Sequence, residues 1–341
     1  MSGGVDSSVA AALLLEEGHD VTGVTMQLWP EGDAEGGCCS VSASRDARRV
    51  CDLLGIPHYV LQFRDVFEHA VVEPFRRAYA EGRTPNPCIV CNDVVKFEEL
   101  LRRAQVQGAE FLATGHYARI VADERGGRWL RRAADENKDQ SYFLYRMTPE
   151  QLGHVLFPVG ELTKPQVRAK AIELGLPTAR KTESQEVCFV PRDDYRAFLA
   201  ASHRAAVQPG PIVDLEGRVL GRHEGVSGFT VGQRKGLGLA GGPWFVVRTD
   251  AETATVVVGP KEALAVRRVL ARDLRWRGGG HEHVGAQLRY RGRALPAEAT
   301  LADDALTVTL VEPEFGVAPG QAIVCYRGDI VIGGGTVEET A

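Results

Sequence analysis

The sequence predicts an α/β domain with a doubly wound parallel sheet, followed by a small β-rich central domain and a C-terminal β-barrel. Short apolar runs alternate with helical periodicity in the first half, the pattern of parallel strands joined by crossover helices. After about Leu199 the pattern changes to short β-like segments between glycines and prolines, and a second break falls near Pro260. We therefore expect three domains, at residues 1–198, 199–262 and 263–341.

The first domain is expected to alternate helices and strands. In chain order these are a helix ending near Gly18, a strand at 21–28, a helix at 44–54, a strand at 58–62, helices at 67–80 and 96–108, a strand at 111–115 and a helix at 165–174. Gly55, Gly175 and Pro177 stop two of these helices. Open parallel sheets bind ligands at the carboxyl ends of their strands, where Met26, Gly115 and His116 are expected.

The second half reads as β structure. Strands are expected at 244–248 and 253–258 in the central domain, and at 305–311, 322–326 and 330–332 in the barrel. The stretch 225–242, which precedes these strands, is dense in glycine.

The composition is that of a soluble globular protein, with 341 residues, 44% hydrophobic and 25% charged. No apolar run is long enough to span a bilayer, and no signal peptide is recognisable, so we expect a cytoplasmic protein without a membrane partner. The chain has seven cysteines, an odd number. In a reducing compartment this favours thiol chemistry or metal binding over a disulfide framework.

Charge is distributed unevenly along the chain. The net charge of −5 by itself argues against a nucleic-acid partner. However, residues 267–293 contain eight arginines against Asp273 and Glu282, and the balance reverses from Leu301 onward. One face could therefore bind phosphates, although an ordinary solvated arginine-rich surface explains the pattern equally well.

Residues Ser2 to Ser8 form a glycine-hydroxyl-carboxylate loop that opens an apolar helix. Adjacent glycines and a helix N-terminus present bare N–H groups to an anion, Ser7 and Ser8 add hydroxyl donors, and Asp6 could hold Mg²⁺. No lysine follows Gly4, so a pyrophosphate grip fits better than the loop of ordinary NTPases. The alternative is a plain helix start with a serine N-cap and an acidic first turn.

Two cysteines, Cys88 and Cys91, lie in a proline-stiffened loop expected just before the helix at Lys96. A cysteine near a helix N-terminus has a lowered pKa and becomes a nucleophile. A C-x-x-C pair is also half of a zinc or iron–sulfur site, to which Cys38-Cys39 or His116 would have to contribute. No second C-x-x-C exists, so we expect no metal site here.

Two further segments are open to two interpretations. Cys188 has apolar neighbours, so it is either a buried strand cysteine or a reactive thiol; Cys51 and Cys325 look structural. The run Lys138 to Leu144 combines a cation, polar donors and aromatics, which suits phosphates and unstacked bases, but it also suits a solvated turn before a half-buried element.

Taken together, these motifs resemble the tRNA-specific 2-thiouridylase family, a branch of the ATP pyrophosphatases, over nearly the whole chain. The matching segments are Ser2 to Ser8, Thr84 to Pro87 with Cys91-Asn92, Thr114 to Arg119, Lys138 to Leu144, Ser184 with Cys188-Phe189, Gly232 to Gly238, and Arg289 to Arg291. Their order and spacing carry the resemblance. It implies an adenine nucleotide alpha hydrolase-like fold for the first domain and sulfur insertion at C2 of the wobble uridine, driven by ATP with Mg²⁺.

The resemblance implies roles for individual residues. ATP would be bound by the loop Ser2, Gly3, Gly4, Val5, Asp6, Ser7 and Ser8, together with Met26 and Gly115. Cys188 would carry a persulfide from a donor protein, and Cys91 would release the sulfur by forming a disulfide with Cys188. Asn86, Pro87 and Cys88 would contact the target base of glutamate, glutamine or lysine tRNA, and His116, Lys138, Asp139, Gln140, Arg289, Tyr290 and Gln321 would contact other parts of the tRNA.

The sequence departs from the family pattern at two positions. Relatives have a hydrophobic strand before the loop, whereas Met1 stands directly before Ser2, so we expect either a start further upstream or an incomplete sheet. Cys88 replaces a residue that is often acidic in relatives, so a general base is not expected there.

Other functions stay open. These are a 4-thiouridine-forming, 2-thiocytidine-forming or amide-forming ATP pyrophosphatase and, in a different class, a non-catalytic RNA-binding protein. The cysteine pair argues against amide formation, and pyrophosphate release distinguishes an enzyme from a binding module.

Overall fold

The computed structural model describes residues 1–28, 41–182, 187–190, 197–199 and 208–341. The chain forms two compact units, each of which gathers segments from several parts of the sequence. The first consists of Met1–Val71, Cys88–Asp193 and Asp329–Val331, and the second of Val72–Pro87, Asp194–Gly328 and Ile332–Ala341.

The first unit mixes helices with short strands. Its helices are α1 (Val5–Glu16), α2 (Val41–Leu54), α3 (Arg64–Phe67), α5 (Pro87–Val90, whose first residue belongs to the second unit), α6 (Leu101–Val106), α7 (Ser141–Leu144), α8 (Pro149–Gly153) and α9 (Lys164–Glu173), with π-helical turns η1 (Glu68–Val72, whose last residue belongs to the second unit) and η2 (Cys91–Leu100). Its strands are β1 (Gly23–Gln27), β2 (His58–Gln62), β3 (Leu112–Ala113), β4 (Arg119–Ala122), β5 (Arg128–Arg131) and β6 (Val155–Leu156). None of the described helices is long and apolar enough to cross a membrane.

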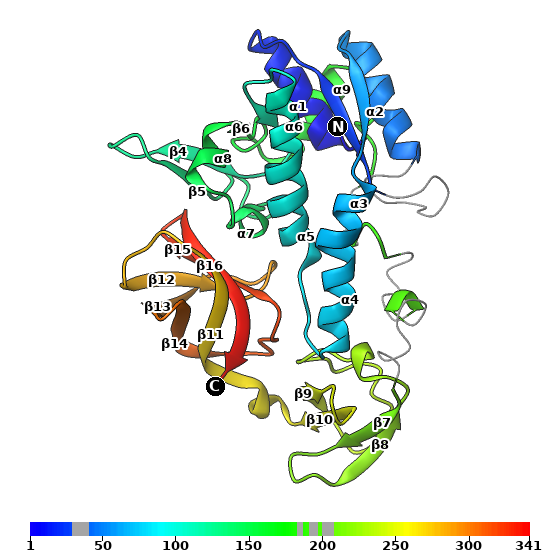
Figure 1. Cartoon of the computed structure of the whole chain (residues 1–341), viewed down its shortest axis with the longest axis vertical. Coiled ribbons are helices and arrows are strands. Elements are labelled where there is room, and N and C mark those ends of the chain that lie inside the picture. Colours follow the sequence, from blue (N-terminus) through cyan, green and yellow to red (C-terminus); the bar gives the residue numbers. More distant parts are fainter. Residues whose placement is uncertain (29–40, 183–186, 191–196, 200–207) are drawn as a thin grey trace. The chain divides into compact units, whose positions relative to one another are not determined.

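The predicted parallel strands are present as two parallel pairs. β1 pairs with β2 from Gly23 opposite His58 to Gln27 opposite Gln62, and β3 pairs with β6. Helices α1 and α9, which are far apart in the sequence, lie side by side, and α2 packs beside α1 (Figure 1). Val9, Val50 and Val167 belong to the core between these helices and are fully buried. The predicted α/β class is confirmed.

The predicted helix at 96–108 begins earlier than expected. The sequence analysis starts it at Lys96, but helical structure runs without a break from Pro87 through α5, η2 and α6 to Val106. Proline has no backbone N–H and a fixed φ suited to a first helical turn, so Pro87 begins the helix rather than stiffening a loop. The expectation that Cys88 and Cys91 lie in a loop is therefore wrong, and both are helical.

The second unit contains the β-rich half of the chain. It comprises α4 (Glu73–Ala80), strands β7 (Gly210–Val213), β8 (Val219–His223), β9 (Phe245–Asp250), β10 (Thr255–Gly259), β11 (Ala265–Trp276), β12 (His281–Gln287), β13 (Leu295–Ala302), β14 (Ala305–Phe315), β15 (Ala322–Arg327) and most of β16 (Ile330–Thr340), and 3₁₀ turns η5 (Val226–Gly228) and η6 (Lys261–Leu264). Strands β8, β7, β10 and β9 form the central sheet in that order, around a core that includes Ile212, Val246 and Val256.

Six strands close the predicted barrel. Their order is β11, β14, β13, β12, β15, β16, and β16 pairs back onto β11. Sequence analysis found β14, β15 and the start of β16 but missed β11, β12 and β13. In β11, Val266, Val269 and Ala271 are buried while Arg267, Arg268 and Arg272 are exposed, so the first arginines of the arginine-rich stretch belong to a half-buried strand, with a register shift between Val266 and Arg268.

Candidate active site

The N-terminal loop leads into α1 with its first backbone N–H groups uncapped by a side chain. Gly4 is the N-cap residue and makes no side-chain capping bond. The hydroxyls of Ser7 and Ser8 instead donate to the Gly4 carbonyl oxygen, at 3.2 and 2.8 Å. The alternative of an ordinary serine-capped helix start is therefore wrong, and the positive end of the α1 dipole is available to an anion.

Two glycines let other segments approach this loop closely. Gly3 has φ +67°, and a Cβ there would lie 2.2 Å from the Ala43 carbonyl oxygen on α2. Gly115 follows β3, and a Cβ there would lie 2.6 Å from the Ser7 nitrogen. Neither position has space for a side chain. Because glycine has none, the predicted Gly115 can lie directly against Asp6 and Ser7.

Asp6 is held by two groups from distant parts of the chain. The Lys164 ammonium lies 2.7 and 2.9 Å from its two carboxylate oxygens, and the Tyr117 hydroxyl donates to it at 2.7 Å. Lys164 is the first residue of α9 and is only 7% exposed, and its backbone N–H donates to the Asp135 carboxylate at 2.9 Å. A buried lysine held by a fixed carboxylate is a preorganised positive charge.

A second lysine reaches the same loop. The Lys181 ammonium donates to the Gly3 carbonyl oxygen at 3.0 Å and to Asp46 on α2 at 2.6 Å. The buried Thr178 hydroxyl donates to the Ser8 hydroxyl at 3.0 Å. No lysine follows Gly4 in the sequence, but the fold brings Lys164 and Lys181 to the loop. Their positions far along the chain gave no sign of this.

These groups fit a polyphosphate. Uncapped N–H groups, a close-packed glycine loop and two lysines provide donors and positive charge together. Asp6 does not fit the predicted Mg²⁺ ligand in this arrangement, because the Lys164 ammonium already lies against both of its oxygens. Met26, also predicted for this site, is half-buried near the end of β1.

His116 lies three residues after β3, among aromatic side chains. Its ring is 5.8 Å from that of Phe97 and 6.1 Å from that of Phe157, and Nδ1 lies 2.8 Å from the Thr114 hydroxyl. Burial, reinforced by the nearby Lys96 ammonium, holds the pKa of His116 well below its ordinary value. The ring is therefore neutral at pH 7 and acts as a hydrogen-bonding group rather than as a cation.

Cys91 is half-buried at the start of η2, and the residues that follow fix its position. Buried Asn92 donates to the Phe143 carbonyl oxygen at 3.4 Å and accepts from Lys96 at 2.8 Å. Asp93 accepts from the Arg146 guanidinium at 2.6 Å. The turn that carries Cys91 is thus tied to the segment around α7, and sequence analysis did not foresee this role of Lys96 and Arg146.

The other cysteines divide by exposure. Cys88 is exposed, and Cys188 is half-buried in a turn just before buried Phe189, whose ring packs edge-on against Phe67 at 5.7 Å. Cys51 and Cys325 are buried, and burial raises the pKa of both thiols, that of Cys325 to about 12, as expected for structural cysteines. Cys38, Cys39 and Ser184 lie outside the described residues.

In the Lys138–Leu144 run, Asp139 and Gln140 hold the backbone. The buried Asp139 carboxylate accepts from Arg132 at 2.8 Å, from the Ala133 N–H at 3.0 Å and from the Ser141 hydroxyl at 2.8 Å. The Gln140 amide oxygen accepts from the Tyr117 N–H at 2.9 Å. Lys138 is half-buried beside them. Since these bonds use the Asp139 carboxylate and the Gln140 oxygen, both residues fix the shape of the segment.

Within the second unit, the barrel contacts the loop that precedes Pro87. The Gln321 side chain donates to the Thr84 carbonyl oxygen at 2.7 Å, and the Thr84 N–H donates to the Pro319 carbonyl oxygen at 2.9 Å. Half-buried Asn86 follows in the same loop, and buried Pro87 begins α5. The predicted positions Gln321 and Asn86 are thus connected through one short loop.

The arginine-rich surface is partly neutralised by the acidic end of the chain. Arg289 donates to Glu314 at 2.8 Å, and Arg272 donates to Glu338 at 2.7 Å. Both arginines are more than half exposed, and Tyr290 beside Arg289 is half-buried. Barrel closure therefore brings together the two oppositely charged segments that the sequence keeps apart.

Comparisons with known proteins agree with this architecture. Residues 1–192 match the family model described as tRNA methyl transferase HUP domain, residues 196–260 the tRNA methyl transferase PRC-barrel domain, and residues 266–337 the aminomethyltransferase beta-barrel domain. Among solved structures, NMN synthetase from Francisella tularensis matches at a TM-score of 0.32 and 21% identity over 54% of this chain and 63% of that chain, too low to support any argument.

Three curated relatives carry the name tRNA-specific 2-thiouridylase MnmA. The protein from Heliobacterium modesticaldum is 54% identical over 99% of this chain and 91% of its own length. That from Moorella thermoacetica is 52% identical over 100% and 99%, and that from Rhodospirillum centenum is 50% identical over 99% and 90%.

The fold and the matched family models define a HUP-domain protein joined to two β domains, and a HUP domain implies ATP binding. With these relatives matched along nearly its entire length, the chain belongs to the tRNA-specific 2-thiouridylase family.

Proposed function

We propose that this chain is a tRNA-uridine 2-sulfurtransferase, which uses ATP to replace O2 of the wobble uridine with sulfur in glutamate, glutamine and lysine tRNAs. One observation carries the proposal: the phosphate cradle at Ser2–Ser8 belongs to the same compact unit as Cys91 and Cys188. A site for activation and two thiols for sulfur transfer are the parts that such a reaction requires. The relatives' names supply the substrate class.

Activation is the task of the cradle. A uracil carbonyl oxygen is a poor leaving group, so O2 would attack the α-phosphorus of ATP, with loss of pyrophosphate, and C2 would then carry AMP as a leaving group. The uncapped N-terminus of α1 and the ammonium groups of Lys164 and Lys181 would hold the phosphates and stabilise the departing pyrophosphate. Gly115, which lacks a side chain, would let the segment after β3 lie against Asp6 and Ser7 and so support the loop that binds ATP.

Sulfur transfer would use Cys188 and Cys91. The terminal sulfur of a Cys188 persulfide, supplied by a donor protein, would attack C2, and AMP would leave with the C–O bonding electrons. The Cys91 thiolate would then attack Sγ of Cys188. Cleavage of the S–S bond would leave its electron pair on the sulfur of the new 2-thiouridine and a Cys91–Cys188 disulfide on the protein. An external thiol would reduce this disulfide before the next turnover.

The remaining predicted residues would position the tRNA. Asn86, Pro87 and Cys88 would lie at the flipped-out base, with the loop held by Gln321. His116, neutral at pH 7, and Lys138 would contact the tRNA from the first unit, with Asp139 and Gln140 holding the shape of the segment. Arg289 and Tyr290 would contact it from the barrel.

Formation of 2-thiouridine tests the proposal. The protein is incubated with unmodified glutamate, glutamine or lysine tRNA, Mg-ATP and sulfide, and the digested tRNA is assayed for 2-thiouridine; sulfide bypasses the donor protein. We expect 2-thiouridine only when ATP is present. A tRNA-stimulated pyrophosphate release that yields a different modified base would contradict the substrate, and tRNA binding with no ATP cleavage would favour a non-catalytic RNA-binding protein.

A further inference from the structure

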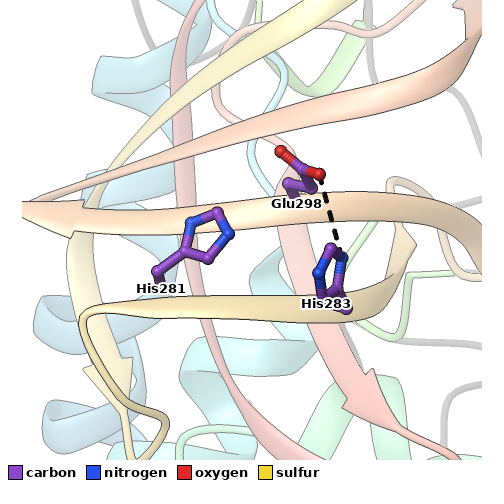
Figure 2. A group of neighbouring side chains, drawn as sticks. All are labelled: His281, His283 and Glu298. Carbon is purple, nitrogen blue, oxygen red and sulfur yellow. Dashed lines mark ion pairs between the residues drawn. The ribbon is translucent and has the colours of Figure 1, made fainter.

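Three potential metal ligands gather on the outer face of the barrel, where β12 pairs with β13. Figure 2 shows His281 and His283 on one strand and Glu298 on its neighbour. Alternate residues of a strand point to the same face, so two histidines separated by one residue leave β12 on the same side. The antiparallel register places Glu298 directly opposite His283.

The ligand atoms of these three side chains are close to one another. One nitrogen of each histidine and one carboxylate oxygen all lie within 4.8 Å of each other, and His283 Nδ1 is 3.8 Å from Glu298 Oε1. Ligands of a tetrahedral Zn²⁺ ion at its usual bond lengths are about 3.3 Å apart, so inward shifts of about 1.5 Å or less complete the geometry. The side chains are exposed, and small rotations bring them together.

The strands beneath the cluster are fixed in position. On β12 the intervening Glu282 is bound by the Gly279 N–H at 2.8 Å and by Arg327 at 2.7 Å, while Val284 is buried. On β13 the neighbours of Glu298, Ala297 and Ala299, are buried. The scaffold is therefore a packed sheet that points the three ligands outward and does not need to rearrange to receive an ion.

One ligand has a neighbouring group that selects its tautomer. His281 Nδ1 lies 3.1 Å from the hydroxyl of Thr300, the residue opposite it on β13. A proton on Nδ1 in this bond leaves the lone pair on Nε2, the form in which a histidine binds a metal. Hydrogen bonds of this kind orient metal-binding histidines in general.

We propose that His281, His283 and Glu298 bind a divalent transition-metal cation, with Zn²⁺ as the best match. Two imidazoles and one carboxylate form a set of nitrogen and oxygen ligands that Zn²⁺ accepts, whereas Mg²⁺ and Ca²⁺ prefer oxygen ligands alone. Three protein ligands leave the fourth coordination position to water or to a small anion. Among the described residues, this is the one group of three or more histidine, cysteine or acidic side chains whose ligand atoms all lie within 4.8 Å of one another. It contains none of the cysteines.

Zinc binding to the full chain tests the site. Titration calorimetry with ZnCl₂ after chelator treatment compares the wild type with His281→Ala/His283→Ala and with Glu298→Ala. The cysteines also bind zinc, but they are the same in every variant, so the difference between proteins reports the barrel site. His19→Ala, which removes an exposed histidine from the first unit, is the matched control.

We expect the wild type and His19→Ala to bind one more equivalent of Zn²⁺ than the double variant does. Glu298→Ala should still bind this additional Zn²⁺ ion, but with an affinity at least about tenfold lower. Tenfold is the smaller end of the loss in metal affinity that follows even from changes to residues around the ligands. Because an ion bound here joins two strands, Zn²⁺ should also raise the Tm of the wild type more than that of the double variant. Equal Zn²⁺ stoichiometry and affinity in all four proteins would overturn the proposal. If the double variant does not fold, the affinity of Glu298→Ala, in which only an exposed side chain is changed, decides the question.

Discussion

At the scale of single residues, the account depends on two lysines that reach the N-terminal loop from other parts of the chain. Lys164 pairs with Asp6, and Lys181 binds the Gly3 carbonyl oxygen. Ordinary NTPase loops carry their lysine within the motif, whereas this loop lacks one and receives its positive charge through the fold. The charge is thus set in place before any phosphate arrives.

Removing the charge of Lys164 should impair activation of the base. Lys164→Met keeps the long apolar stem and removes the ammonium, so we expect tRNA-dependent pyrophosphate release to fall about 100-fold, as on loss of a preorganised charge-stabilising group. Initial rates of pyrophosphate release at saturating tRNA measure this change.

Lys170→Met provides the control for that variant. It lies on the same helix, α9, but pairs with Glu16 and Glu173 instead of with the loop. Its pyrophosphate release should remain close to that of the wild type. Wild-type release by Lys164→Met, with an unchanged KM for ATP, would show that Lys164 has only a structural role.

Some residues of the candidate site could be predicted from the sequence, and others could not. Gly3 and Gly115 were predicted from local motifs, and in the structure the backbone of another segment lies too close to either for a side chain. The sequence did not predict that Lys164, Tyr117 and Lys181 contact the loop. Each is brought there only by chain folding over more than one hundred residues. The structural use of Asp139, an acceptor of several internal bonds, was likewise invisible in a motif.

At the scale of elements, the helix that carries the cysteines is the main difference between expectation and structure. It starts at Pro87, so Cys88 lies in its first turn and Cys91 about one turn further on. Residues three apart lie on the same side of a helix, which a loop would not ensure. Sequence analysis assigned the prolines of this segment to a loop, although proline is equally suited to a first helical turn.

The loop before this helix is held by the turn that precedes β15. Gln321→Ala removes the bond to the Thr84 carbonyl oxygen, so we expect the tRNA-dependent kcat/KM for thiolation to fall about tenfold, equivalent to about 1.4 kcal/mol, within the range for one hydrogen bond. ATP binding without tRNA should not change. Thiolation rates over a range of tRNA concentrations measure the effect.

Thr309→Ala, which alters an exposed side chain on the outer face of β14, is the control for the Gln321 variant. If Gln321→Ala thiolated tRNA as efficiently as Thr309→Ala, the bond to Thr84 would have no part in presenting the loop.

At the scale of the whole molecule, alternation in the sequence predicted an α/β part and a barrel, and the structure has both. The barrel strand β11 was missed because its exposed arginines were interpreted as a surface feature, whereas its buried residues, such as Val269 and Ala271, define a strand. The opposite charges of the two C-terminal segments were visible in the sequence. Their pairing, as in Arg272 with Glu338, required barrel closure.

We propose that one compact unit performs two separable steps, activation at the cradle and sulfur transfer at the thiols. A single-turnover reaction of Cys188→Ser, compared with the wild type, in the presence of unmodified tRNA, Mg-ATP and a persulfide sulfur donor tests this directly, with pyrophosphate and 2-thiouridine both quantified. We predict about one equivalent of pyrophosphate per active site and no 2-thiouridine, because the base can be activated but no persulfide can form. Normal 2-thiouridine formation by Cys188→Ser, or no pyrophosphate release by a folded Cys188→Ser protein, would contradict this account.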